Sequence, residues 1–265
     1  MDLGLRDRAC IITGASGGIG RTTALTLVAE GAAVLLVARN QQALEGVARE
    51  CREAGGRAQT LAVDVTQPDA GDRVLEASIV HFGGIDVLVN NAGTSAAKSL
   101  EELTDEDWQT QWDLHVMAPM RLMRAAAPAM AERGWGRIVN VSSSSGKRPG
   151  QRNIAYSVTK AAELSLSRAL ADIYARKGVL INSITPGPVS SRLWIAPGGL
   201  ADQVAEKSGK TREEVLESTA TGVPIGRFAT EHEIAAAIAF LCSEPASYVA
   251  GAAWSVDGGA VPVII

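Results

Sequence analysis

The sequence predicts a single α/β domain over residues 1–265, built on a doubly wound, mostly parallel sheet of seven strands with helices on both faces. Three observations predict this fold class. Short aliphatic runs alternate with longer segments of helical period, and a glycine cluster joins the first such pair. The 265 residues are 46% hydrophobic and 20% charged, which suits one large core without a linker.

The first half of the chain repeats a unit of one strand followed by one helix. Continuous apolar runs, typical of strands covered on both faces, predict strands at Ala9–Thr13, Val34–Ala38, Ala58–Ala62 and Val87–Asn90. Helical period predicts helices between them, at Thr22–Ala29, Gln41–Ala54 and Asp69–Phe82. Strands and helices that alternate in this way form a parallel sheet.

The second half begins with a helix start. Thr104 and Asp107 have the spacing of a capping box, so we expect one long helix from there to about Arg133. The remaining elements are predicted from the same patterns: strands at Arg137–Val141, Leu180–Ile184 and Ala252–Val256, and helices at Ile154–Lys177 and Glu231–Cys242.

An irregular stretch follows the sixth strand. Pro186, Gly187 and Pro188 continue neither a strand nor a helix, so we expect a lid over about residues 190–226. Thr211 and Glu214 again have capping-box spacing, which predicts that part of this lid is helical.

Composition excludes several classes of function. A formal charge of −4 gives no basic excess for nucleic-acid binding, and no apolar run approaches the length of a membrane span. Cys10, Cys51 and Cys242 are odd in number and far apart, so we expect neither a disulfide framework nor a metal site. The N-terminus lacks the order of a signal peptide, and a cytoplasmic protein with a small-molecule substrate is the expectation.

The glycine cluster runs from Thr13 to Gly20, directly after the first strand and before a helix. Glycines at such a junction let the backbone turn tightly and approach a pyrophosphate, which the helix N-terminus favours. The alternative is an ordinary strand-to-helix turn. The strand before it and the helix after it favour a dinucleotide site.

The second strand ends at Ala38, Arg39 and Asn40, where a dinucleotide fold places the residue that contacts the adenosine ribose. An acidic residue there would bind the 2′-hydroxyl of NAD. Arg39 instead favours the 2′-phosphate of NADP(H), with NAD(H) still possible. The alternative is a solvated arginine at the end of a strand.

Three further residues have the types needed for carbonyl chemistry. Tyr156 and Lys160 lie four apart on a predicted helix and share one face, and Ser143 follows the strand Arg137–Val141. Reduction of a ketone needs a proton for the developing alkoxide, and a neighbouring cation makes a tyrosine hydroxyl a better donor near neutrality. With Ser143 orienting the carbonyl oxygen, the set predicts hydride transfer between the cofactor and a ketone or secondary alcohol.

Taken together, these motifs resemble the short-chain dehydrogenase/reductase (SDR) family, which has a Rossmann fold, from about Leu5 to Gly259. The resemblance rests on Thr13 to Gly20, Asp64-Val65, Asn90 to Gly93, Ser143, Tyr156 to Lys160, Pro186-Gly187 and Val256 to Gly259. It is greatest to the 3-oxoacyl-[acyl-carrier-protein] reductase type of member. It implies a homotetramer formed through the two long helices and the C-terminal strand.

The resemblance also implies which residues contact the cofactor: Gly14, Ser16, Gly17, Gly18, Ile19, Gly20, Arg39, Asp64, Val65, Asn91, Ala92, Gly93, Tyr156, Lys160, Pro186, Gly187, Val189 and Ser191. Two positions depart from the family pattern. Gly17 stands where many NADP-preferring members have a basic residue. His115 stands where members usually have an asparagine that is linked through water to the catalytic lysine, so we count it as a fourth catalytic candidate.

His115 leaves two interpretations open. A histidine that titrates near neutrality would oppose Lys160 when charged, and activity would then fall below about pH 6.5. The alternative is a packed histidine that takes no part in proton transfer, with the proton relay to the lysine formed by backbone groups and water.

The motifs leave the substrate open. Apolar lid residues suit a hydrophobic substrate such as a 3-oxoacyl thioester, or they pack the lid itself: Leu193, Trp194, Ile195, Leu200 and Val204. Arg133, Arg176 and Lys177 would dock an acidic carrier or are solvated helix ends. The rival function is a cofactor-binding sensor or a weakly active enzyme, on account of His115. An epimerase is disfavoured by the glycine spacing.

Overall fold

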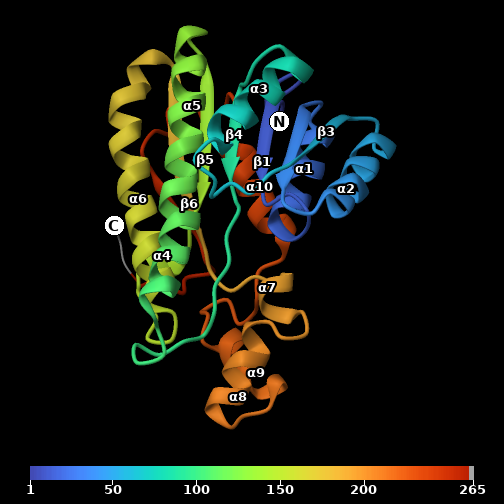
Figure 1. Ribbon diagram of the computed structural model, residues 1–265. Helices are drawn as coiled ribbons and strands as arrows, with labels where there is room; N and C mark the ends of the chain where they lie inside the picture. Colours follow the sequence, from blue (N-terminus) through green and yellow to red (C-terminus); the bar gives the residue numbers. More distant parts are fainter. Residues whose placement is uncertain (263–265) are drawn as a thin grey trace.

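The computed structural model describes residues 1–262 and has the predicted doubly wound architecture (Figure 1). Seven strands form one sheet in the order β3-β2-β1-β4-β5-β6-β7, with every neighbouring pair parallel. The strands are β1 Ala9–Thr13, β2 Ala33–Ala38, β3 Arg57–Ala62, β4 Val87–Asn90, β5 Gly136–Val141, β6 Val179–Pro186 and β7 Ala253–Val256. The domain bounds of 1–265 stay a prediction, and residues 263–265 lie outside the described residues.

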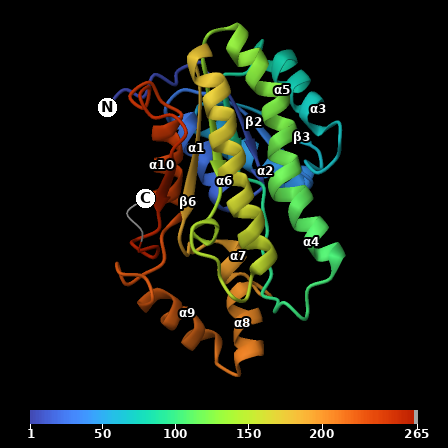
Figure 2. The same ribbon diagram turned by 90° about the vertical axis from the view of Figure 1, so that its left-hand side faces the viewer.

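Helices cover both faces of this sheet, as the two views show (Figures 1 and 2). The helices on one face are α1 Gly18–Ala29, α2 Gln41–Glu53 and α10 Glu231–Leu241. Those on the other are α3 Ala70–Phe82, α5 Ala118–Glu132 and α6 Ile154–Tyr174, with α4 Asp105–Trp112 leading into α5. None of the helices in residues 1–262 combines the length and apolarity needed to cross a membrane.

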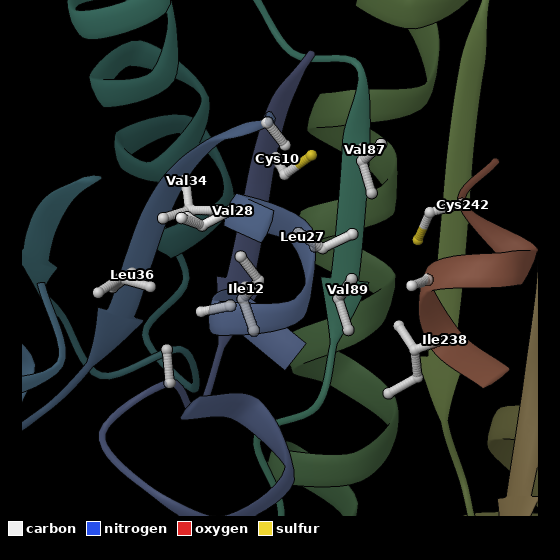
Figure 3. Packing of buried hydrophobic residues seen from close by; sticks show 14 of the residues in the cluster. Cys10, Ile12, Leu27, Val28, Val34, Leu36, Val87, Val89, Ile238 and Cys242 are labelled. Atoms are coloured by element: carbon white, nitrogen blue, oxygen red, sulfur yellow. The ribbon is translucent and has the colours of Figure 1, made fainter. Parts of the chain in front are cut away.

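Two hydrophobic cores result, one on each face. Successive residues of a strand point to opposite faces, so Ile12 and Leu36 join one core while Ile11 and Leu35 join the other. Figure 3 shows the first core, where strand residues meet Leu27 of α1 and residues of α10. Burial on both faces explains why these strands read as continuous apolar runs.

The long helix expected from Thr104 to about Arg133 is not continuous. Its start is confirmed, because Thr104 and Asp107 form a complete capping box. The helix is then interrupted by a π-helical segment, Asp113–Met117, in which the N–H of Ala118 donates to the carbonyl of Asp113. Pro119 has no N–H to donate to the carbonyl of His115, which an uninterrupted α-helix would require.

Other boundaries move by a few residues. The first helix begins at Gly18 rather than at Thr22, so the end of the glycine cluster is already helical. The sixth strand runs on to Pro186, whose register partner on β7 is Val256. Pro186 is the last residue of β6 and lies beyond Ile184, the last β6 residue paired with β5, so its missing N–H interrupts no ladder with that strand. The helix from Ile154 ends at Tyr174 and is followed by one 3₁₀ turn.

The stretch expected as a lid contains three short helices, α7 Arg192–Ile195, α8 Leu200–Ser208 and α9 Arg212–Thr221. The predicted capping box of Thr211 and Glu214 is present at the start of α9. Both views show α8 and α9 projecting beyond the end of the sheet at which the strands terminate (Figures 1 and 2). This segment is therefore placed over the edge where doubly wound sheets bind ligands.

Candidate active site

A cleft of about 760 Å³ lies at the carboxyl ends of the strands, beneath α7. Loops that follow β1, β4, β5 and β6 form its walls, because parallel strands all end at this edge. Most of the residues predicted from the sequence line it: Ser143, Tyr156, Lys160, Gly14, Ser16, Gly17, Gly18, Ile19, Arg39, Asn91, Gly93, Pro186, Gly187, Val189 and Ser191. Gly20, Asp64, Val65, Ala92 and His115 are not among its lining residues.

The glycine cluster forms a tight cradle between β1 and α1. Gly14 has φ +66°, in the left-handed region where glycine is favoured. A Cβ on Gly20 would lie 2.4 Å from the carbonyl oxygen of Gly14, so only glycine lets α1 pack this closely. The amide of Asn91 donates to the carbonyl of Thr13 at 2.9 Å and holds the cradle from β4.

Thr13 ties the same loops together from within the core. Its hydroxyl donates to the carbonyl of Val89 and accepts from the backbone N–H groups of Asn91 and Ala92, at 2.9 and 3.1 Å. Ala92 and Val65 line a separate small cavity. The loop after β4 is fixed against the glycine cradle before any ligand binds.

Two arginines flank this cradle. Arg39 directly follows β2. The pKa of Asp64, after β3, is lowered mainly by a hydrogen bond from the backbone N–H of Thr66, and the charge of Arg39 adds a smaller contribution. Arg192 of α7 reaches over from the lid, with its Cδ 3.8 Å from where a Cβ of Gly17 would lie. A tight glycine cradle at a helix N-terminus with two arginines beside it fits a dinucleotide that carries a 2′-phosphate.

Ser143, Tyr156 and Lys160 also line the cleft, and the hydroxyl of Ser142 donates to the carbonyl of Lys160, which brings them to one wall. Ser143 follows β5, and its Oγ accepts from the N–H of Ser145 at 3.1 Å, which leaves the hydroxyl hydrogen for another partner. Tyr156 and Lys160 lie one turn apart at the start of α6. The Lys160 ammonium is 5.9 Å from the centre of the Tyr156 ring.

Lys160 is almost completely buried, and its ammonium donates to the carbonyl of Val141 and to the carboxylate of Glu163, each at 2.9 Å. The strand end thereby fixes the lysine from one side and helix α6 fixes it from the other. Such a buried cation next to a tyrosine is the arrangement expected for tuning a proton donor.

His115 lies in the π-helical segment and is fully buried behind Gly93 and Tyr156. Its Nε2 accepts from the backbone N–H of Thr94 at 3.3 Å, and its Nδ1 is 3.2 Å from the Thr159 hydroxyl. Because that hydroxyl donates to the carbonyl of Tyr156, it accepts from His115, which fixes one neutral tautomer.

The expectation that His115 titrates near neutrality is therefore wrong. Burial, and secondly the charge of Lys160, hold the pKa of His115 well below its ordinary value. The loss of activity expected below about pH 6.5 from a charged His115 thus has no basis in this environment. The histidine is a packed one, as the alternative interpretation had it.

Several cleft residues were not found by sequence reasoning. They are polar residues of the loops and one arginine of the lid: Thr94, Ser95, Ser144, Ser145, Asn153 and Arg192. Those after β4 and β5 follow strand ends, which is a signal that could have identified them. Glu163 was also missed, although its position three residues after Lys160 places it on the same helical face.

Comparisons with known proteins identify the family of this chain. The chain matches the short chain dehydrogenase family over residues 8–196. L-sorbose reductase from Gluconobacter frateurii, solved in complex with NADPH and L-sorbose, is similar with a TM-score of 0.93, 39% identity and 100% coverage of both chains.

Two curated relatives also match nearly end to end. Short-chain reductase protein NovJ of Streptomyces niveus is 35% identical over 255 residues, covering 96% of this chain and 94% of the relative. The 3-oxoacyl-[acyl-carrier-protein] reductase FabG of Thermotoga maritima is 31% identical over 259 residues, covering 97% of this chain and 99% of the relative. The fold agrees with these matches, and the chain belongs to the short-chain dehydrogenase family of oxidoreductases.

Proposed function

We propose that this protein reduces a ketone to a secondary alcohol with NADPH, and catalyses the reverse reaction with NADP⁺. The observation that carries the proposal is the presence of Ser143, Tyr156 and Lys160 on one wall of a cleft whose other end is a glycine cradle. A cofactor sensor needs the cradle but not this wall, so the wall favours an enzyme. Bound NADPH would supply the hydride, and the side chains of the protein would orient the ketone and supply the proton.

The residues divide the proton and orientation chemistry between them. Ser143 donates a hydrogen bond to the carbonyl oxygen and holds it next to the Tyr156 hydroxyl. Tyr156 gives its proton to that oxygen as negative charge develops there. Lys160 keeps a positive charge beside Tyr156, which lowers the cost of leaving a tyrosinate behind. His115 holds the loop at Thr94 through its neutral ring.

Preference for NADP(H) over NAD(H) follows from the two arginines. The Arg39 guanidinium can bind the 2′-phosphate of the ribose by charge-assisted hydrogen bonds. Arg192 takes up, from the lid, the role that a basic residue at position 17 has in many family members, since its side chain lies against Gly17. The L-sorbose reductase that this chain resembles was solved with NADPH, which supports the same preference.

For the substrate we favour a small hydroxylated ketone. Ser95 lines the cleft, and its buried hydroxyl has no hydrogen-bond partner in residues 1–262. Thr94, Ser145 and Asn153 add further polar groups to the same space. A buried hydroxyl is costly without a partner, and a substrate hydroxyl would provide one when the Ser95 side chain turns toward the cleft. The complex of the similar reductase with L-sorbose supports this substrate class.

The second candidate is a 3-oxoacyl thioester. Leu193, Trp194 and Leu200 line the cleft from the lid and offer an apolar wall to an acyl chain. FabG of Thermotoga maritima, which is similar over nearly its whole length, supports this alternative. The Trp194 ring, however, already packs edge-on against Phe228 at 5.4 Å, which favours a role in packing the lid.

A substrate panel tests the two classes. The loss of NADPH absorbance is followed with ketoses, simple ketones, diketones and 3-oxoacyl thioesters, for the wild type and for Ser95→Ala. We expect the highest kcat/KM with a ketose and a loss of about tenfold for that substrate in Ser95→Ala, the value of one hydrogen bond. Faster turnover of the thioester, with no effect of Ser95→Ala, would favour the second candidate.

We also propose a cytoplasmic homotetramer. Exposed apolar side chains lie on α4, α6 and β7, at Trp112, Ile173 and Trp254, and a homotetramer would cover them. The three cysteines are all free and buried, which supports a reducing compartment.

A further inference from the structure

The catalytic wall contains an ion pair that is hidden from solvent. The Lys160 ammonium and a carboxylate oxygen of Glu163 are 2.9 Å apart, and their side chains are only 4% and 3% exposed. The two residues lie three apart on α6, so the helix itself fixes their separation. Glu163 thus forms an ion pair with the cation on which the proposed proton transfer depends.

Few charges surround this pair. Tyr156 lies on the cleft side on α6, and the neutral His115 faces Lys160 from the π-helical segment. On the far side, Glu163 borders a small cavity whose other described lining residues carry no charge: Thr13, Val65, Asn90, Ala92, Leu114, Ala118, Pro119 and Leu122. Burial raises the pKa of Glu163 above its ordinary value, and Lys160 opposes that rise.

Stability alone is a weak reason for such a pair. Removing two charges from water costs several kcal/mol, and packed apolar side chains often stabilise a protein as well as a buried ion pair does. A carboxylate at this position does, however, change what the lysine does to its neighbours. It fixes the ammonium against Val141, and it partly cancels the positive field that Tyr156 experiences.

We propose that Glu163 is a positioning residue for the proposed reaction: it holds the Lys160 ammonium in place and sets the pH at which Tyr156 releases its proton. The inference rests on the proposed function for its role in catalysis. It rests only on the geometry of the Lys160–Glu163 pair for its effect on Tyr156.

The direction of the effect follows from charge. Replacing Glu163 by glutamine removes a negative charge but keeps an oxygen that can accept from Lys160. Loss of a nearby negative charge makes every neighbouring group release its proton at lower pH, whether that group is Tyr156 or Lys160. Both shifts reduce the population that has a protonated Tyr156 and a charged Lys160, so both move the alkaline limit of ketone reduction toward lower pH.

The first test needs no substrate. The chain has three tyrosines, so NMR of protein labelled at the tyrosine ring carbon next to oxygen gives three signals, with Tyr156 assigned from Tyr156→Phe. We expect Tyr156 to titrate about one pH unit lower in Glu163→Gln than in the wild type. Asp172→Asn is the matched control, since it removes the carboxylate of an exposed ion pair on the same helix.

An unchanged Tyr156 titration in a folded Glu163→Gln variant would overturn the proposal, as would an equal shift in Asp172→Asn. If Glu163→Gln does not fold, Glu163→Leu makes the same change in charge without burying an amide. Glu163→Asp keeps the charge and should restore the titration of the wild type.

The second test uses activity. In Glu163→Gln the alkaline limb of kcat/KM for ketone reduction should shift down by about one pH unit, while the KM for ketone at low pH stays within about twofold. A lower kcat at all pH values without any shift would indicate a purely structural role and contradict the proposal. An inactive wild type would contradict the proposed function, whereas the NMR result would still decide the role of Glu163.

Discussion

At the scale of single residues, the proposed preference for NADP(H) depends on two arginines that come from distant parts of the chain. Arg39 follows the second strand, and Arg192 belongs to the lid, yet both line the cleft, and Arg192 lies next to Gly17. Arginine suits this task because its planar guanidinium can bind a phosphate through two hydrogen bonds.

We expect Arg39→Ala to weaken NADPH binding by about 10- to 100-fold, the value of a charge-assisted hydrogen bond, and to leave NADH binding within about twofold. Arg192→Ala should show the same selectivity. The dissociation constants follow from fluorescence titration of both cofactors, with the exposed Arg49→Ala of α2 as control. An equal loss for NADH and NADPH would mean that the arginines hold the pyrophosphate instead.

His115 gives a second prediction at this scale, about stability against pH. The folded state keeps its pKa well below that of an unfolded histidine, about 6.5, so the unfolded chain binds the extra proton first. The contribution of His115 to the free energy of unfolding is therefore fully present above about pH 6.5. It falls as the pH drops below that value, by up to about 1.4 kcal/mol per pH unit.

His115→Asn should therefore lose less stability than the wild type between about pH 6.5 and 4.5. Urea unfolding at a series of pH values measures this, and His232→Asn, which changes an exposed histidine, is the control. Parallel curves for the wild type and His115→Asn would show that the ring is protonated in the folded state.

At the scale of elements, the junction of β1 with α1 is the least tolerant of change. A Cβ on Gly20 would clash with the carbonyl of Gly14, whereas a Cβ on Gly46, in the middle of α2, would have no heavy atom within 4 Å among the described residues. The two glycines are both helical, so they form a matched pair.

Gly20→Ala should destabilise the fold by about 1–3 kcal/mol and weaken NADPH binding, because β1 and α1 must move apart. Gly46→Ala should stabilise by about 0.5–1 kcal/mol and leave NADPH binding unchanged. Thermal unfolding and cofactor titration of both variants test this. Equal effects of the two substitutions would contradict the account of the cradle.

Helix starts were predictable from sequence, whereas the π-helical segment was not. The capping boxes at Thr104 and Thr211 depend on two side chains three residues apart, which sequence displays directly. The π-helical segment depends on two things: the carbonyl that loses its donor at Pro119, and the new hydrogen bonds that the neighbouring N–H groups then form. That segment determines where His115 lies, so the interpretation of His115 could not be decided from sequence.

At the scale of the whole molecule, the sheet and the place where Ser143 meets the glycine cradle were predictable for one reason. Parallel strands bring their carboxyl ends to one edge, so Ser143 and the glycine cradle had to meet there. The contact between Arg192 and Gly17 depends on how the lid folds back, which no local pattern displays. The burial of Glu163 was equally unpredictable, since carboxylates are mostly exposed.

Assembly is the prediction that belongs to this scale. We expect light scattering after size-exclusion chromatography to give four times the mass of the chain. Ile173→Glu, which charges an exposed apolar position on α6, should reduce that mass, while Val80→Glu on α3 should not. A monomer in the wild type would contradict the proposed homotetramer.

The most direct test of the central claim compares the wild type with Tyr156→Phe, using the best ketone of the substrate panel. The rate of NADPH consumption and the dissociation constant of NADPH are measured for both. We predict that Tyr156→Phe lowers kcat by at least about a hundredfold, the usual contribution of a general acid, and binds NADPH as the wild type does. Tight NADPH binding without turnover of any ketone by the wild type, or full activity in Tyr156→Phe, would contradict it.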